Sequence, residues 1–290
     1  MRLNSLRRLL NVKKCIRLLE IHSGLSGLIV ENISITNDEG ISEFDGMWAS
    51  SLTSSTTKGK PDNEAVDLTS RLSMLNEVIE VTTKPIIYDA DTGGQKEHLV
   101  FTIRTLERLG ISAAVIEDKT GLKKNSLFEN TSDQVHENID IFCDKISTAK
   151  KAQITDDFMV VARIESLILS KGVSDAISRA KAYIDAGADS ILIHSKSKDP
   201  TEVYEFCDKY NLFKKRKPLI VVPSSYNKTY EEELIDNGAN VIIYANHLLR
   251  SAYPNMISTA LSILENKRSF EADESMLPIK ELLELIPDRE

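Results

Sequence analysis

The sequence predicts an α/β protein built as a (β/α)8 barrel of the TIM type. Eight short runs rich in β-branched residues alternate with longer helical patterns along the 290 residues, as in successive βα units. Several runs, such as PLIVV and NVIIYA, are apolar throughout, which is typical of parallel strands covered on both faces. Glycine closes three helical segments shortly before a strand, at Gly110, Gly187 and Gly238. A doubly wound open sheet is the alternative, weakened because no glycine-rich nucleotide-binding motif follows a strand.

The strands are expected where apolar and β-branched residues cluster. In chain order they cover Cys15–Ile21, Asp45–Ser50, Pro85–Asp89, Ala113–Glu117, Phe158–Ile164, Ser190–His194, Pro218–Pro223 and Asn240–Ala245. The helices between them are expected where apolar residues recur with helical spacing. They cover Glu97–Leu109, Gln134–Ala149, Val173–Ala186, Pro200–Tyr210 and Tyr230–Asp236.

The C-terminal part departs from this alternation. Past Asn255 we expect a helix at Met256–Glu265, then a polar stretch, then a short amphipathic helix at Met276–Leu285. The last piece lies beyond the eight strands and is free to pack elsewhere. We therefore expect a catalytic barrel domain over residues 1–255 and a helical extension over residues 256–290 that packs on a neighbouring subunit.

The composition is that of a soluble globular protein, with 41% hydrophobic and 28% charged residues. The net charge of -8 argues against a nucleic-acid partner, which would need a basic face. Cys15, Cys143 and Cys207 show no CxxC spacing, which favours a reducing compartment over a disulfide framework. No window approaches the roughly 20 apolar residues that span a bilayer. We expect a cytoplasmic protein without a membrane partner.

Ionisable residues gather where the predicted strands end, which is where a β/α barrel carries its active site. Taken singly, each has a structural explanation: an aspartate after a strand usually caps a helix, an arginine can neutralise a carboxylate, and a histidine can be a core residue. Together they point to a site. They are Asp89 and Asp91 after the third strand, Glu117 at the end of the fourth, Arg163 and Glu165 on the fifth, and His194 on the sixth.

The three acids Asp89, Asp91 and Glu117 predict a metal site. Burying several carboxylates at one end of a barrel is costly without a compensating cation. Mg²⁺ prefers oxygen ligands and commonly keeps several waters. We therefore expect Asp89 to bind the metal directly, with Asp91 and Glu117 holding metal-bound water. The absence of clustered histidine or cysteine ligands argues against zinc.

Several motifs resemble those of the phosphoenolpyruvate mutase family, within the isocitrate lyase superfamily. Glu117-Asp118-Lys119, five residues and then Asn125-Ser126 resemble the family's EDK-x5-NS signature. The likeness covers roughly residues 15–250 in the same order. Further matches are HSGLSG (His22–Gly27), DGMWAS (Asp45–Ser50), DNE (Asp62–Glu64), DADTG (Asp89–Gly93), ARIE (Ala162–Glu165) and IHS (Ile193–Ser195).

The resemblance implies an activity and an assembly. The activity is the reversible, Mg²⁺-dependent rearrangement of phosphoenolpyruvate into phosphonopyruvate, the first step toward natural products with a C–P bond. The assembly is a homodimer or homotetramer in which the C-terminal helix is swapped. One segment departs from the family: Asn32–Ser42 looks longer than expected, either as a surface insertion or as a change in subunit contacts.

The resemblance also implies roles for the site residues. Arg163 would take the transferring phosphoryl group, and His194 would support that group or the enolate. The segment Thr120–Leu127 would act as a lid that excludes water. The remaining assignments are Lys123 and Asn125 as phosphoryl contacts from the lid, Asp62 as a phosphoryl acceptor or an orienting group, and Trp48, Ser50, Ser51, Leu52 and Ser126 as substrate-binding residues.

Three other functions are weighed against the mutase. Phosphonopyruvate hydrolase shares the barrel and metal site, but the family's hydrolases tend to lack the asparagine that stands here at Asn125. Lyases of the isocitrate or methylisocitrate kind carry a catalytic cysteine in a KKCGH-like loop, and Thr120–Leu127 contains no cysteine. A non-catalytic relative that only binds a carboxylated phosphate would have no need for the acids, Arg163, His194 and the lid.

Overall fold

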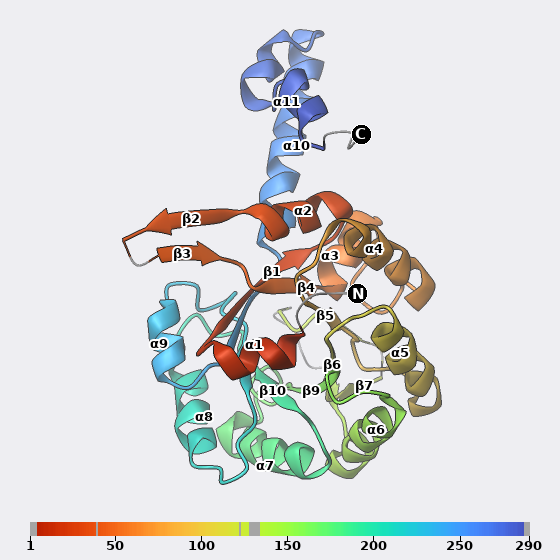
Figure 1. The fold of residues 1–290 in the computed structure, drawn as a ribbon, viewed down its shortest axis with the longest axis vertical. Helices are drawn as coiled ribbons and strands as arrows, with labels where there is room; N and C mark the ends of the chain where they lie inside the picture. Colours follow the sequence, from red (N-terminus) through yellow and green to blue (C-terminus); the bar gives the residue numbers. More distant parts are fainter. Residues whose placement is uncertain (1–4, 39, 122, 128–133, 287–290) are drawn as a thin grey trace. The chain divides into compact units, whose positions relative to one another are not determined.

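Eight parallel strands close into a barrel in the order β1-β12-β11-β10-β9-β6-β5-β4 (Figure 1). The structure, a computed structural model, describes residues 5–38, 40–121, 123–127 and 134–286. The strands are β1 (Ile16–Ile21), β4 (Gly46–Ala49), β5 (Ile86–Asp89), β6 (Ala113–Glu117), β9 (Met159–Ile164), β10 (Ser190–Ile193), β11 (Leu219–Val221) and β12 (Val241–Tyr244). Each lies within the run predicted for it. The barrel prediction is confirmed, and the open sheet is excluded.

Helices follow the strands around the outside of the barrel (Figure 1). They are α2 (Gly24–Asn32), α3 (Ser51–Thr57), α4 (Leu68–Val81), α5 (Lys96–Arg108), α6 (Ile139–Ala152), α7 (Gly172–Asp185), α8 (Thr201–Asn211) and α9 (Glu231–Asp236). Helices α5 to α9 are predicted from the sequence, whereas α2, α3 and α4 are not. The predicted start of α6 at Gln134 is too early. The Asn138 side chain accepts hydrogen bonds from the N–H groups of Asp140 and Ile141 and so caps the helix there.

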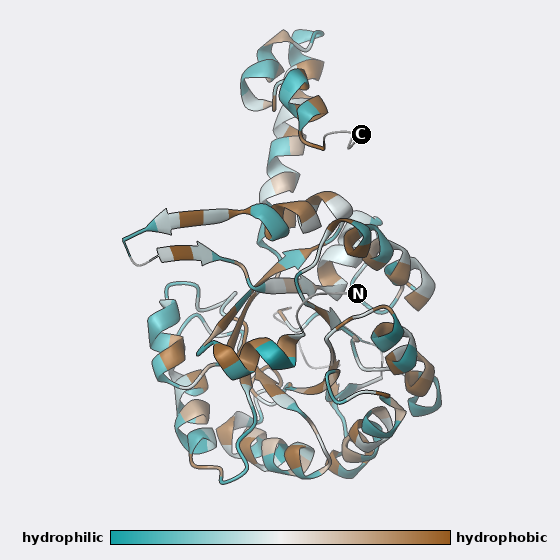
Figure 2. Cartoon of the chain, in the orientation of Figure 1, coloured by the Kyte–Doolittle hydropathy of each residue, from teal (hydrophilic) through white to brown (hydrophobic). Residues whose placement is uncertain are grey.

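The segment Asn32–Ser42, noted for its length, contains most of an antiparallel hairpin. Strand β2 (Ser34–Asn37) pairs with β3 (Gly40–Glu43) outside the barrel sheet. Figure 2 shows a hydrophobic band on each strand of this hairpin, where Ile35 is 65% exposed and Ile41 is 73% exposed. The described part of the segment therefore forms an exposed hairpin at the surface.

The barrel interior is a packed apolar core with a closed amino-terminal end. Side chains from all eight strands form one buried cluster, which also contains Leu6 of the short helix α1 (Leu6–Val12). The cluster includes residues that begin their strands, such as Met159 and Val241. Arg7 Nη2 donates to Asp189 Oδ1 at 2.8 Å and ties α1 to the residue before β10. The amino-terminal end is thus filled, and the carboxyl end is left for a site.

Residues 247–290 form a second compact unit, described to residue 286. It contains α10 (His247–Asn266), the 3-10 helix η1 (Phe270–Ser275) and α11 (Ile279–Glu284). Helix α10 begins at His247, earlier than the predicted Met256–Glu265. Its interior contains Pro254, although proline usually stands in the first turn of a helix. Of the helices that the structure describes, none is long and apolar enough to cross a membrane.

Candidate active site

The closed barrel directs the ionisable residues of the strand ends toward its axis. Each lies two positions after a core residue, and side chains two apart on a strand share a face. The carboxyl ends of parallel strands also meet at one end of the barrel. The pairs are Ile87 and Asp89 on β5, Val115 and Glu117 on β6, Val161 and Arg163 on β9, and Leu192 with His194 directly after β10.

Asp89 and Asp91 form the acidic side of the site. Asp89 is buried and accepts hydrogen bonds from the backbone N–H and the hydroxyl of Ser51, at 3.2 and 2.9 Å. Burial alone would raise the pKa of Asp89, but Lys123 and two arginines outweigh it and lower the pKa below its ordinary value. For Asp91 burial wins, and the pKa is raised despite Lys123 and Arg71. Two neighbouring carboxylates thus respond in opposite directions.

Arg71 is a site residue that the sequence did not reveal. It comes from α4, is buried, and its Nη1 donates to Asp91 Oδ2 at 2.7 Å. Its guanidinium also lies over the Tyr88 ring, 4.2 Å from the centroid. A pattern in the sequence could have found it, because Arg71, Met74 and Val78 follow helical spacing on the buried face of α4.

Glu117 is buried, and neither of its carboxylate oxygens accepts a hydrogen bond. Lys119 Nζ and Arg163 Nη2 lie 3.3 and 3.4 Å from these oxygens. Burial raises the pKa of Glu117 to about 7, against the opposing effect of the two cations. A buried carboxylate without hydrogen-bond donors is a position that a further cation would stabilise.

The donor set fits Mg²⁺, although no ready ligand cluster is formed. Within the described residues, no three His, Cys, Asp or Glu side chains converge closely enough to hold a metal ion. Asp89 and Asp91 are nevertheless adjacent, since the Asp91 N–H donates to Asp89 Oδ1 at 3.3 Å. Glu117, whose oxygens accept no hydrogen bond, adds further hard oxygen donors. Few direct ligands and several retained waters are the usual pattern for this ion.

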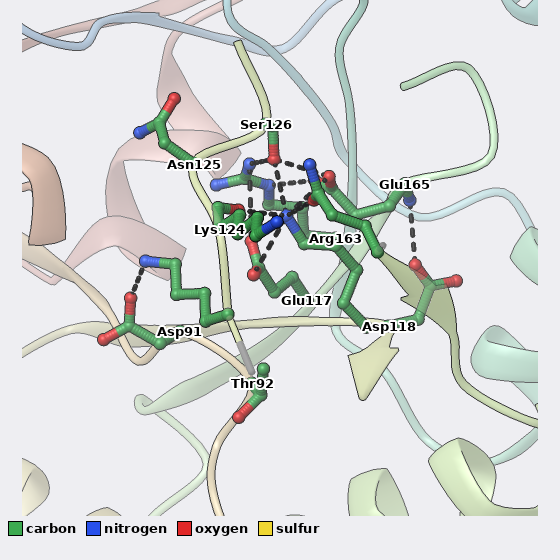
Figure 3. Close-up of polar contacts among 12 residues, drawn as sticks. Asp91, Thr92, Glu117, Asp118, Lys124, Asn125, Ser126, Arg163 and Glu165 are labelled. Atoms are coloured by element: carbon green, nitrogen blue, oxygen red, sulfur yellow. Dashed lines mark hydrogen bonds and ion pairs between the residues drawn. The ribbon is translucent and has the colours of Figure 1, made fainter. Parts of the chain in front are cut away.

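Glu165 organises the basic side of the site. Its Oε1 accepts from Arg163 Nε at 2.6 Å, and its Oε2 accepts from the Ser126 hydroxyl at 2.6 Å (Figure 3). Its Oε1 also lies 2.7 Å from His194 Nε2. Burial and Arg163 lower the pKa of His194 against the opposing effect of Glu165. The sequence places Glu165 among the ionisable strand-end residues but indicates no role for it. The structure shows that it orients both Arg163 and His194.

The loop after β6 reaches across the site and brings in Asp62. Lys123 Nζ donates to the Ser51 hydroxyl at 2.8 Å and to Asp62 Oδ1 at 3.0 Å, and it also contacts Asp91. Asn125 Nδ2 donates to Asp62 Oδ2 at 2.7 Å. Burial opposes the charge of Lys123, but the surrounding carboxylates raise its pKa well above the ordinary value.

One pocket unites most of the predicted site. All predicted site residues except Asp91, Glu117 and Glu165 line it, so the structure brings Trp48, Asp62 and the loop residues together with Arg163 and His194. Further polar residues that were not predicted from the sequence also line the pocket. They are Ser195, Ser224, Ser225 and Asn246. Their signal in the sequence is their place after the sixth, seventh and eighth strands, and Ser195 also belongs to the IHS motif.

The chain is similar to known proteins over nearly its whole length. A family model described as phosphoenolpyruvate phosphomutase matches residues 6–264. The phosphoenolpyruvate phosphomutase of Tetrahymena pyriformis is 33% identical over 281 residues, which are 97% of this chain and 89% of that protein. The phosphonopyruvate hydrolase of Variovorax sp. (strain Pal2) is 32% identical over 247 residues, 84% of each chain.

Two solved structures share the fold closely. A phosphoenolpyruvate phosphomutase from Streptomyces platensis subsp. rosaceus has a TM-score of 0.88 and 33% identity, covering 97% of this chain and 93% of that chain. A phosphonopyruvate hydrolase in complex with oxalate and Mg²⁺ has a TM-score of 0.83 and 30% identity, with the same coverage. With the family model, these findings show that the chain belongs to the phosphoenolpyruvate mutase family, in the PEP mutase/isocitrate lyase superfamily.

Proposed function

We propose that this protein is a phosphoenolpyruvate mutase, which interconverts phosphoenolpyruvate and phosphonopyruvate for phosphonate biosynthesis. The observation that carries the proposal is the contact of Asn125 Nδ2 with Asp62, 2.7 Å apart in the pocket. Asn125 belongs to the EDK-x5-NS motif, and the family's hydrolases tend to lack this asparagine. The segment Thr120–Leu127 also contains no cysteine, which argues against a C–C bond lyase.

The reaction needs positioning and charge more than it needs a strong nucleophile. The P–O bond of phosphoenolpyruvate breaks and a P–C bond to its methylene carbon forms, while the enolate oxygen becomes the ketone of phosphonopyruvate. Mg²⁺, when bound by Asp89 with Asp91 and Glu117, would supply positive charge to the oxyanions of the pyruvyl unit. The transfer requires no other reactant.

The chain's own residues have distinct roles in this proposal. Arg163 binds the phosphoryl oxygens, and Glu165 presents its guanidinium in a fixed orientation. His194, held by the same carboxylate, supports the transferring group. The contacts of Lys123 and Asn125 with both Asp62 oxygens support an orienting role for Asp62.

The substrate would bind where the pocket offers small polar groups. Ser50 and Ser51 begin α3 at the end of β4, and they line the pocket together with Trp48 and Leu52. The positive end of the helix dipole favours a carboxylate. We assign the substrate carboxylate to this side and the phosphoryl group to the side of Arg163 and Ser126.

The alternative is phosphonopyruvate hydrolase, favoured by the nearly equal identity of the Variovorax relative. Incubation of the purified protein with phosphonopyruvate and Mg²⁺, followed by phosphorus NMR, separates the two. We expect conversion to phosphoenolpyruvate that is lost with EDTA. Release of inorganic phosphate by the wild-type protein would establish the hydrolase instead. No turnover of phosphonopyruvate would overturn both.

We also propose a cytoplasmic homo-oligomer, a dimer or a tetramer, in which the extension after the barrel packs on a neighbouring subunit. Helix α10 has no buried residue, yet its apolar side chains include Ile257, Leu261 and Leu264, all at least 44% exposed. Apolar faces of this kind favour burial against a partner. The three free cysteines support a reducing compartment.

A further inference from the structure

Lys119, the last residue of the EDK motif, is a buried lysine with no part in the mechanism above. Its side chain is 2% exposed. It lies on the two-residue strand β7 (Lys119–Thr120), which pairs with β8 (Val135–His136). This pairing joins the two ends of the loop that carries Lys123 and Asn125. Lys119 therefore stands where the loop leaves the barrel and returns to it.

The ammonium of Lys119 donates its hydrogen bonds to residues of the loop. An ammonium has three protons to donate, and Nζ lies 2.8 Å from the Ser126 hydroxyl, 3.0 Å from Gln134 Oε1 and 3.1 Å from the Lys124 carbonyl. One cation thus contacts both the outgoing and the returning part of the loop.

Neutralising the buried acids is the simpler explanation for Lys119, and the geometry does not favour it. Glu117 and Glu165 lie 3.3 and 3.2 Å from its Nζ, farther than the three loop oxygens. Arg163 already pairs with both carboxylates, at 3.4 and 2.6 Å. The carboxylates balance the charge of Lys119, while its directed contacts go to the loop.

Ser126 connects this arrangement to the reacting end of the site. Its hydroxyl accepts from Arg163 Nη2 at 2.8 Å and donates to Glu165 at 2.6 Å (Figure 3). The same hydroxyl accepts from Lys119 Nζ at 2.8 Å. A hydroxyl has one proton and two lone pairs, so all of its capacity is used. A shift of the loop would break contacts to Arg163 and Glu165 together.

We propose that Lys119 is a positioning residue that latches the loop segment Lys123–Leu127 over the pocket and thereby excludes water. The inference rests on the proposed mutase function, but the latch itself is a structural claim. When the latch is lost, water attacks phosphorus, the P–C bond breaks, and the methylene carbon takes a proton. Phosphonopyruvate then yields pyruvate and inorganic phosphate in place of phosphoenolpyruvate.

Trp48 is a built-in reporter of the latch. It is the single tryptophan of the chain, lines the pocket with Ser126 and Leu127, and is 3% exposed. We expect acrylamide to quench Trp48 fluorescence more strongly in Lys119→Met than in wild type. Lys119→Met keeps an unbranched apolar stem of similar length. The matched control is Lys150→Met, which removes a lysine paired to Asp189 at 2.7 Å, away from the pocket.

Two readouts test the proposal, and Lys150→Met should behave like wild type in both. In Lys119→Met we expect the ratio of phosphate to phosphoenolpyruvate formed from phosphonopyruvate to rise about tenfold. This factor corresponds to the loss of roughly one net hydrogen bond from the closed state of the loop. Quenching equal to wild type in folded Lys119→Met would overturn the latch. Increased quenching with an unchanged ratio would overturn its role in water exclusion.

A second variant tests the latch if Lys119→Met does not fold. Ser126→Ala removes one loop contact of Lys119, together with the hydroxyl contacts to Arg163 and Glu165. It leaves the contacts of Lys119 to Gln134 and Lys124, so we expect a smaller increase in Trp48 quenching than in Lys119→Met. If the wild type does not turn over phosphonopyruvate, the proposed function fails, while quenching in the two variants still decides the latch.

Discussion

A buried tyrosine on α7 supports the strand end that carries Arg163 and Glu165. The Tyr183 hydroxyl donates to Asp118 Oδ2 at 2.6 Å, and the same hydroxyl accepts from Arg179 at 2.8 Å. Asp118 Oδ1 in turn accepts from the backbone N–H of Glu165 at 2.8 Å. Both Tyr183 and Asp118 are fully buried. Tyr183→Phe should therefore remove a charge-assisted hydrogen bond without leaving a cavity.

The magnitude follows from the kind of acceptor. A hydrogen bond to a charged group contributes about 1.5–3 kcal/mol, and the substituted ring would keep its packing on Phe142, whose centroid lies 4.7 Å from that of the Tyr183 ring. We expect Tyr183→Phe to lower the free energy of unfolding by about 2 kcal/mol. The matched control is Tyr210→Phe, since the hydroxyl of this buried tyrosine donates to a neutral acceptor, the Lys217 carbonyl, at 3.0 Å. That change should cost about 1 kcal/mol.

Urea denaturation followed by circular dichroism measures both variants. The slope of unfolding free energy against urea should stay constant, so the difference appears in the midpoint. A loss in Tyr183→Phe no larger than in Tyr210→Phe would refute the reasoning that the Asp118 acceptor strengthens the bond. If the barrel does not unfold in one reversible step, the comparison uses the midpoints of the first transition.

Further predictions concern the metal, the site and the assembly. EDTA should abolish turnover of phosphonopyruvate, and added Mg²⁺ should restore it; activity retained in EDTA would contradict a metal requirement. Arg163→Lys should lower kcat/KM by about 10²–10³, because a lysine cannot bind phosphate oxygens in a bidentate manner; a change below about threefold would remove Arg163 from the site. Asn125→Ala should reduce the mutase rate and increase phosphate release in phosphorus NMR. Leu261→Glu should lower the mass of the particle measured by light scattering, and an unchanged mass would show that Leu261 of α10 does not contribute to the subunit interface.

The sequence by itself determined the barrel strands and the ionisable residues at their ends. Uninterrupted apolar runs such as Leu219–Val221 indicate parallel strands, because burial on both faces removes the polar alternation. A residue two positions beyond a core residue shares its face, which is why the strand pattern alone places Asp89 and Arg163 at the site. The motif around Asn125 could also be recognised in the sequence, because its residues are close together along the chain.

Tertiary structure alone decided which of these groups meet. Arg71 contacts Asp91 across 20 positions, and Lys123 contacts Asp62 across 61 positions. Local periodicity carries no information about such pairs, because helix packing and barrel closure set them. The same limit explains why the sequence indicated no role for Glu165. Its function in holding Arg163 and His194 exists only once β9 and β10 lie side by side in the closed barrel.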